Sequence, residues 1–200
     1  MSVHPSLEDD GHLRGEPHCV TLHGVSWEDY ERLLVMRGDH SAPRIHYLDG
    51  EVEIMSPSRT HESVKSRIGC LLEAWCLFVG IDFEVVGAWT LKKEKKKAGA
   101  EPDECYIFRG EDMERPHLAI EVDWSSRTLD KLEICRRLKV AELWVWYRGH
   151  VQIHVLRGGS YEPSERSEAL PELDLPFLMQ FIDRKTTSQA IRDYRAALGA

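Results

Sequence analysis

The chain has 200 residues, of which 42% are hydrophobic and 30% are charged, and its formal net charge is −8. Such a chain can bury one sizeable core, so a single domain is expected. Nonspecific phosphate binding comes from clustered Lys and Arg, so the negative net charge argues against a protein that coats nucleic acid through its overall charge. It does not exclude a local basic groove.

The N-terminal sequence shows no targeting segment. It has no apolar h-region, and no run of eighteen apolar residues occurs in the chain, which predicts a cytoplasmic protein without a membrane span. Residues 1–18 are acidic and lack apolar periodicity, so a disordered leader is expected before a single domain over residues 19–200. The five cysteines are dispersed and form no CxxC pair, which is typical of reduced thiols rather than disulfides or a zinc site.

The predicted domain begins with a helix over "SWEDYERLLVM", for which Ser26 is the N-cap candidate. The segment "RIHYLDGEVEIMSP" predicts two strands around the turn "LDGE". A long helix follows from about Thr60 to a stop at Gly80. Its apolar residues recur at three- and four-residue steps and are Val64, Ile68, Leu71, Leu72 and Trp75.

Strands and helices then alternate along the rest of the chain. Strands are predicted for "IDFEVVGAWTLKK" and "PDECYIF", separated by the charged loop "KKEKKKAGAE". The segment "HLAIEVDWSSRTLDKLEI" predicts a strand, a turn and a helix, and "AELWVWYRGHVQIHVL" predicts two strands joined at residues 148–150. From about residue 175, a short helix after Pro176 and a longer one capped near Thr187 or Ser188 end the domain. This order predicts an α/β (α+β) fold with a mixed central sheet flanked by helices.

Two charges occupy positions where the pattern requires apolar residues. In "LAIEVD" the side chains alternate between two faces, Leu118, Ile120 and Val122 on one and Ala119, Glu121 and Asp123 on the other. Lys131 lies in the first turn of the following helix, on the face that packs against the sheet. Its side chain can extend toward Glu121. A buried carboxylate needs such a partner, so these two residues alone are explained by a structural ion pair.

A third group of charges adds a chemical alternative. In "AEPDECYIF", Glu101 and Asp103 are expected on one face at the start of a strand. If this strand lies beside "LAIEVD", Asp103 and Glu121 converge on a hard divalent cation such as Mg²⁺. Together with Lys131 they form the minimum set for metal-assisted phosphodiester hydrolysis, in which the lysine would orient or deprotonate the attacking water.

Three further features allow both a functional and a structural interpretation. His61 occupies the first inward position of the long helix, with Glu62 beside it, and a lone inward histidine is more often structural than a ligand. The lysines of residues 92–97 either grip a phosphate backbone or form a solvated loop. Trp144 and Trp146 share one strand face, which is either core or the surface of a homodimer.

The motifs "YLDGEVEIMSPSRTHE", "AEPDECYIF", "HLAIEVDWSSRTLDKLEI" and "VAELWVWYRGHVQIHVL" together resemble the Uma-two family of restriction-endonuclease-like proteins, a branch of the PD-(D/E)xK nuclease superfamily. The resemblance covers about residues 20–178 and implies a restriction-endonuclease-like core with a metal site at one end of the central strands. It places Asp103 as the PD acid and Glu121 as the second acid. Asp123 stands where the lysine is usual, so Lys131 matches the version in which the lysine has moved to the next helix.

The resulting hypothesis is a Mg²⁺- or Mn²⁺-dependent endonuclease that acts on nucleic acid, with DNA as the expected substrate. Asp103 and Glu121 are the expected metal ligands, and Lys131 is their catalytic partner. The second-tier candidates are His61, Glu62, Glu101 and Asp123. The alternative is a catalytically inactive nuclease-fold module that binds a protein or nucleic-acid partner.

Overall fold

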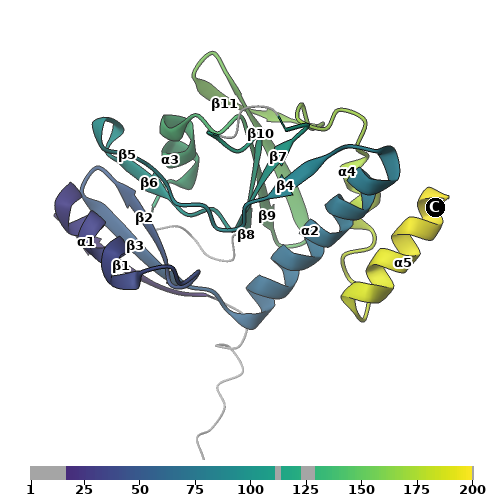
Figure 1. Ribbon diagram of the computed structural model, residues 1–200, viewed down its shortest axis with the longest axis horizontal. Helices are drawn as coiled ribbons and strands as arrows, with labels where there is room; N and C mark the ends of the chain where they lie inside the picture. Colours follow the sequence, from purple (N-terminus) through teal and green to yellow (C-terminus); the bar gives the residue numbers. More distant parts are fainter. Residues whose placement is uncertain (1–16, 111–113, 123–128, 200) are drawn as a thin grey trace, which may run out of the picture.

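The strands of the protein form two sheets in a computed structural model that describes residues 17–110, 114–122 and 129–199 (Figure 1). The first, here called the small sheet, has five strands in the order β1-β3-β2-β6-β5, and all its pairs are antiparallel. Its strands are β1 (His18–His23), β2 (Arg44–Leu48), β3 (Glu51–Ser56), β5 (Leu91–Lys93) and β6 (Ala98–Ala100). Strand β1 thus begins at a residue that the sequence prediction assigned to the leader.

The second sheet, here called the large sheet, has six strands in the order β11-β10-β9-β8-β7-β4. Strands β8 and β9 are parallel, and the other neighbours in this sheet are antiparallel. Its strands are β4 (Phe83–Val85), β7 (Glu104–Phe108), β8 (Leu118–Val122), β9 (Glu142–Tyr147), β10 (His150–Arg157) and β11 (Ser160–Ser164). The parallel pair requires a crossover connection, and the helix α3 lies in it.

The helices begin at side-chain caps. Those of the described residues are α1 (Trp27–Arg37), α2 (Arg59–Val79), the short 3-10 helix η1 (Glu94–Lys96), α3 (Lys131–Leu138), α4 (Leu175–Met179) and α5 (Thr187–Leu198). Ser26 and Ser58 accept hydrogen bonds from the first turns of α1 and α2, and Gly80 ends α2 in the left-handed conformation. The cap of α5 is Thr186, one residue before the predicted position.

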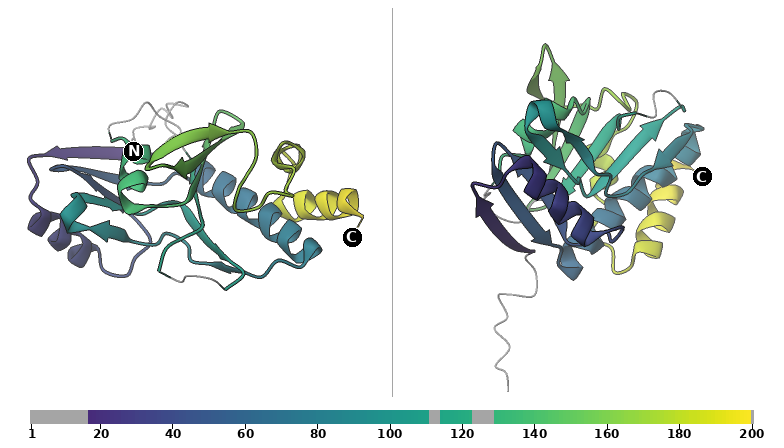
Figure 2. Two further views of the ribbon diagram at one scale, coloured as in Figure 1. Left: turned by 90° about the horizontal axis from the view of Figure 1, so that it is seen from above. Right: turned by 60° about the vertical axis from the view of Figure 1, so that its left-hand side comes forward.

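The two faces of the large sheet are covered differently. Leu118, Ile120 and Val122 face the main core, which they share with α2, α4 and α5. Ala119, on the opposite face of β8, packs with Cys135 of α3. Figures 1 and 2 show α5 beside α2 at one end of the molecule and α1 against the small sheet at the other. The alternation predicted for "LAIEVD" is therefore confirmed over residues 118–122.

The small sheet has its own core and a tight hairpin. Tyr30 of α1 packs against Ile45 and Tyr47 on one face of β2. The β2–β3 turn places Asp49 and Gly50 at φ 48° and 93°, as a two-residue hairpin of this hand requires. Because Ile45 and Tyr47 face α1, the alternate residues Arg44 and His46 face the large sheet.

The structure confirms the predicted mixed sheet flanked by helices but divides the strands between two sheets. The charged loop predicted over residues 92–101 instead contains η1 and β6, because the small residues of "AGA" pair with both β2 and β5. Strands β1 and β11 were not predicted. Trp144 and Trp146 are buried in the main core.

Within the part of the chain that the structure describes, no helix has the length and apolar character needed to cross a membrane.

Candidate functional site

A cavity of about 110 Å³ lies between the small sheet, the large sheet and the first turn of α3. Each of these elements places polar or apolar side chains on its wall. They include Glu53, Met55, His61, Glu121, Lys131 and Gln152. Most of these charged groups are buried, so their partners decide which protonation state each adopts.

The register of β7 and β8 brings the two predicted acids together. Glu104 pairs with Ile120 in this antiparallel ladder, and continuing the register by one residue puts Asp103 opposite Glu121. Residues that are directly opposite project to the same face of a sheet. Both side chains are buried, which means that two carboxylates meet where water cannot screen them.

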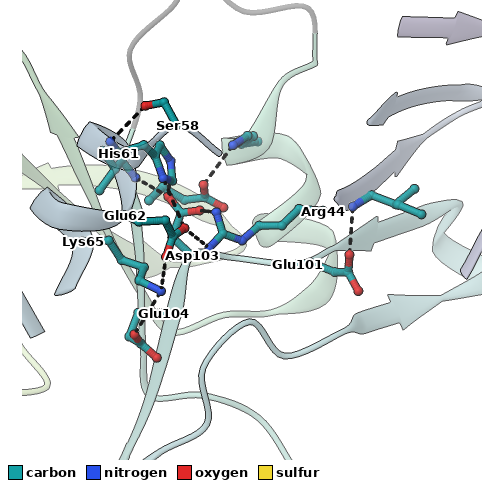
Figure 3. Close-up of polar contacts among 12 residues, drawn as sticks. Arg44, Ser58, His61, Glu62, Lys65, Glu101, Asp103 and Glu104 are labelled. Atoms are coloured by element: carbon teal, nitrogen blue, oxygen red, sulfur yellow. Dashed lines mark hydrogen bonds and ion pairs between the residues drawn. The ribbon is translucent and has the colours of Figure 1, made fainter. Parts of the chain in front are cut away.

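Asp103 is surrounded by donors from three elements (Figure 3). Its Oδ2 accepts a hydrogen bond from the Val122 amide at 2.7 Å and lies 3.0 Å from His61 Nε2. Its Oδ1 forms an ion pair with Arg44 Nη1. Burial alone would raise the pKa of Asp103, but His61 and Arg44 hold it below its usual range. Asp103 is therefore ionised.

The first turn of α2 adds a coupled histidine and glutamate (Figure 3). Burial opposes the charged form of His61, but the carboxylates of Asp103 and Glu62 outweigh it and raise the His61 pKa to about 9. The His61 imidazole, whose Nδ1 lies 3.6 Å from Glu62 Oε1, and Lys65 at 2.9 Å together lower the pKa of Glu62 to about 2. Glu62 also accepts a 2.8 Å hydrogen bond from Arg44, so it belongs to the same charge network as Asp103.

Glu121 has a different partner. Its Oε2 accepts a hydrogen bond from Lys131 Nζ at 2.9 Å, whereas its Oε1 is buried without a hydrogen-bond partner among the described residues. Burial raises the pKa of Glu121, and Asp103 adds to this while Lys131 opposes it. Burial would lower the pKa of Lys131, but Glu121 and Asp103 outweigh it and raise that pKa, which keeps Lys131 a cation.

Strand β2 contributes residues that the sequence prediction missed. Arg44 is 2% exposed and bridges Asp103 and Glu62, and His46 is fully buried on the same face. Burial, followed by the nearby Lys131, lowers the pKa of His46 well below its usual value, so His46 is neutral. The signal was present in "RIHYL", where two polar side chains alternate with the apolar Ile45 and Tyr47.

The predicted residues fall into three groups. The structure brings together Asp103, Glu121, Lys131, His61 and Glu62 around one charge network. It places Glu101 elsewhere, since that carboxylate accepts hydrogen bonds from Arg37, the Ile45 amide and Thr90. The expectation that Glu101 and Asp103 share one strand face was wrong, because the two carboxylates contact different groups: Asp103 contacts the Val122 amide and His61 instead. Asp123 lies outside the described residues.

The two acids differ in whether their carboxylate oxygens are available to a divalent cation. Glu121 Oε1 is buried at the cavity wall and has no hydrogen-bond partner among the described residues, so a cation would satisfy it. Both oxygens of Asp103 already contact protein donors. Among the described residues, no group of three or more His, Cys, Asp or Glu is placed to hold a metal. Mg²⁺ needs only one or two carboxylates beside water, so the site fits a partly hydrated ion.

We predict that Glu101 has a structural role. Replacing Glu101 by Gln removes a buried charge that joins Arg37 of α1 to β2, so the free energy of unfolding should fall by about 3 kcal/mol. Chemical denaturation measures this loss. The matched control is Glu51→Gln, which breaks an exposed pair with His23 and should change stability by less than about 1 kcal/mol. Equal stability of the two variants would contradict the prediction.

We also predict a pH dependence that originates at His61. Because folding raises its pKa from about 6.5 to about 9, its stabilising contribution is complete below pH 6.5 and is lost as the pH rises through 9. In metal-free buffer, the wild type should exceed His61→Gln in stability by about 2–3 kcal/mol more at pH 6 than at pH 10. Thermal melting across this range measures the difference, with the exposed His23→Gln as control. A difference that is constant with pH would contradict the prediction.

Comparison with known proteins identifies a family for this chain. A family model described as "Uma2: Putative restriction endonuclease" matches residues 27–184, a span that includes the whole charge network. No curated protein matches the sequence. The family match extends over more than half of the chain and confirms the resemblance predicted from the motifs. The chain therefore belongs to the Uma2 family of restriction-endonuclease-like proteins.

Proposed function

We propose that the protein is a metal-dependent endonuclease that hydrolyses phosphodiester bonds of DNA, with Mg²⁺ or Mn²⁺ as its cofactor. The observation that carries the proposal is the meeting of two buried carboxylates, Asp103 and Glu121, beside the ammonium of Lys131 at a cavity. Membership of a restriction-endonuclease family supports the reaction class.

Glu121 and Asp103 would hold the metal ion, with water completing its coordination. Such an ion, when bound, lowers the pKa of a coordinated water and stabilises the charge that grows on phosphorus. Glu121 is suited to this role because Lys131 occupies one of its oxygens and leaves Oε1 available. Asp103 is held in one orientation by the Val122 amide, which fixes where its carboxylate meets the ion.

The cations of the site have separate roles. Lys131 remains an ammonium group beside Glu121, so it orients the attacking water and stabilises negative charge rather than removing a proton. Arg44 and His61 position Asp103 and neutralise its charge before a metal arrives. Asp103 would hold a metal ion only if Arg44 shared or released one of its carboxylate oxygens.

A non-catalytic nuclease-fold module that binds a protein or nucleic-acid partner is the second candidate. The observation that favours it is that both acids already have cationic partners, Asp103 in Arg44 and His61, and Glu121 in Lys131. A set of buried ion pairs can neutralise itself without any metal. The two candidates differ in whether the network opens to a divalent cation.

The first test is cleavage of DNA. The purified protein should cut duplex or single-stranded DNA when Mg²⁺ or Mn²⁺ is supplied and should leave it intact in EDTA. Lys131→Met should lower the rate roughly 10²–10³-fold, because it removes a preorganised charge at the reacting phosphate. Asp103→Ala and Glu121→Ala should abolish cleavage.

The matched control for the lysine is Lys185→Met, which alters an exposed lysine between α4 and α5 and should retain the wild-type rate. RNA substrates run in parallel test the choice of DNA. An intact substrate with every metal, or equal rates for wild type and Asp103→Ala, would reject the endonuclease.

The second test is stabilisation by metal. At a hundredfold excess over its dissociation constant, Mn²⁺ should raise the free energy of unfolding by about 2.7 kcal/mol, because only the folded state assembles the ligands. Thermal melting should show this gain in the wild type and its loss in Glu121→Ala. Glu101→Gln, whose carboxylate lies outside the charge network, should keep the gain. A melting temperature that no divalent cation raises would favour the inactive module.

A further inference from the structure

A second charged surface lies at the other end of α3. A hollow of about 760 Å³ is formed by η1, the C-terminal end of α3 and the β2–β3 turn. Its basic residues are Lys95, Lys96, Lys97, Arg136, Arg137 and Lys139, and its acidic residues are Asp49 and Glu133. The formal charge of the lining is therefore +4, whereas that of the chain is −8. The hollow is here called the lysine surface.

The charged residues of the lysine surface are of two kinds, arginines and acids that form ion pairs with each other and lysines that form none with the described residues. Arg137 donates to both carboxylate oxygens of Asp49, at 2.8 and 2.7 Å, and also to Glu133 and the Lys96 carbonyl. Arg136 forms a second ion pair with Glu133. These contacts neutralise the two acids and tie η1 to α3, although the two segments are far apart in the sequence.

The four lysines remain without an acidic partner. Lys95, Lys96, Lys97 and Lys139 are all exposed, and none has a carboxylate within ion-pair distance among the described residues. Neighbouring Lys92 differs, since it pairs with Glu31 at 2.8 Å. Ammonium groups that are clustered and unneutralised attract a polyanion, because each contact with a phosphate releases a bound counterion.

Two of the lysines occupy positions that glycine normally takes. Lys97 follows η1 at φ 46°, and Lys139 ends α3 at φ 61°, where its amide donates to the carbonyls of Arg136 and Cys135. Glycine favours this left-handed conformation at a helix end, and a residue with a side chain adopts it at a conformational cost. Lysine is nevertheless the C-cap residue of both η1 and α3, despite this conformational cost. Both side chains line the same hollow.

The lysine surface is connected to the candidate site by one rigid element. Helix α3 begins at Lys131 and ends next to Lys139, so its eight residues separate the two by roughly 12 Å along the axis. Figure 1 shows the β5–β6 connection, which contains η1, beside α3. A phosphodiester backbone whose reacting phosphate lies beside Lys131 can therefore extend to the lysine surface over a few nucleotides.

We propose that the lysine surface binds the phosphate backbone of duplex DNA adjacent to the cleavage site. This inference rests on the proposed function for its choice of DNA, but it concerns binding outside the cavity. The contacts would be to phosphates alone, so they add affinity and register without reading the base sequence.

The test measures binding without cleavage. Fluorescence anisotropy of a labelled DNA duplex in EDTA gives the affinity of the full chain over a series of salt concentrations. The variant Lys95→Gln/Lys97→Gln/Lys139→Gln should lower the affinity at least about tenfold and reduce the slope of log K against log salt by about 2 to 3.

The matched control is Lys185→Gln/Arg192→Gln/Arg195→Gln, which removes the same charge from three exposed residues at or near α5. It should keep the wild-type slope. Equal losses in both triple variants would mean that overall charge causes binding, and that result overturns the proposal. So does a wild type that binds no duplex DNA, or one that binds an RNA duplex more tightly through the same lysines.

The outcome separates this inference from the proposed function. Binding that depends on the lysines, in a protein that never cleaves DNA, supports the lysine surface and rejects the endonuclease. Metal-dependent cleavage with an unchanged salt slope in the lysine variant supports the endonuclease and overturns the lysine surface.

Discussion

The meeting of Asp103 and Glu121 across β7 and β8 is the constraint on which the rest of the structure depends. Two carboxylates that are adjacent and buried repel each other, and burial removes the water that would screen them. Cations must therefore come from other elements, and they come from Arg44 of β2, His61 of α2 and Lys131 of α3. These contacts bring β2 of the small sheet and the first turns of α2 and α3 to the two acids.

The surrounding cations and amides satisfy the two acids unequally. The difference lies in the contacts of their carboxylate oxygens. Asp103 accepts a hydrogen bond at Oδ2 and forms an ion pair through Oδ1, whereas Glu121 Oε1 at the cavity wall has no hydrogen-bond partner among the described residues. A closed network would only offset the cost of burying its own charges, because the attraction within buried ion pairs does little more than replace lost hydration. An oxygen left over beside an ammonium group and a second carboxylate is instead the arrangement that a divalent cation and a phosphate can complete.

Helix α3 has two functions in this architecture. Its first residue, Lys131, completes the charge network, and its last turn is fixed to η1 through Arg137 and the Lys96 carbonyl. A short helix does not bend appreciably, so the distance between the cavity and the lysine surface is set by its length. One element thus places both the charge that would promote the proposed reaction and the charge that would hold a backbone, in a chain whose overall charge is negative.

The sequence by itself determined the helices, most of the strands and the faces of β8, because apolar periodicity, caps and turn residues act over a few neighbours. It therefore predicted Glu121 and Lys131 as partners and placed Asp103 near them. Only the tertiary structure decided that Glu101 turns toward α1, that Arg44 joins the network, and that β6 pairs with β2 and β5 in a separate small sheet. These outcomes depend on contacts between residues that are distant in the chain, and the electrostatic free energy of a buried charge is set by all its neighbours in space rather than by those in sequence.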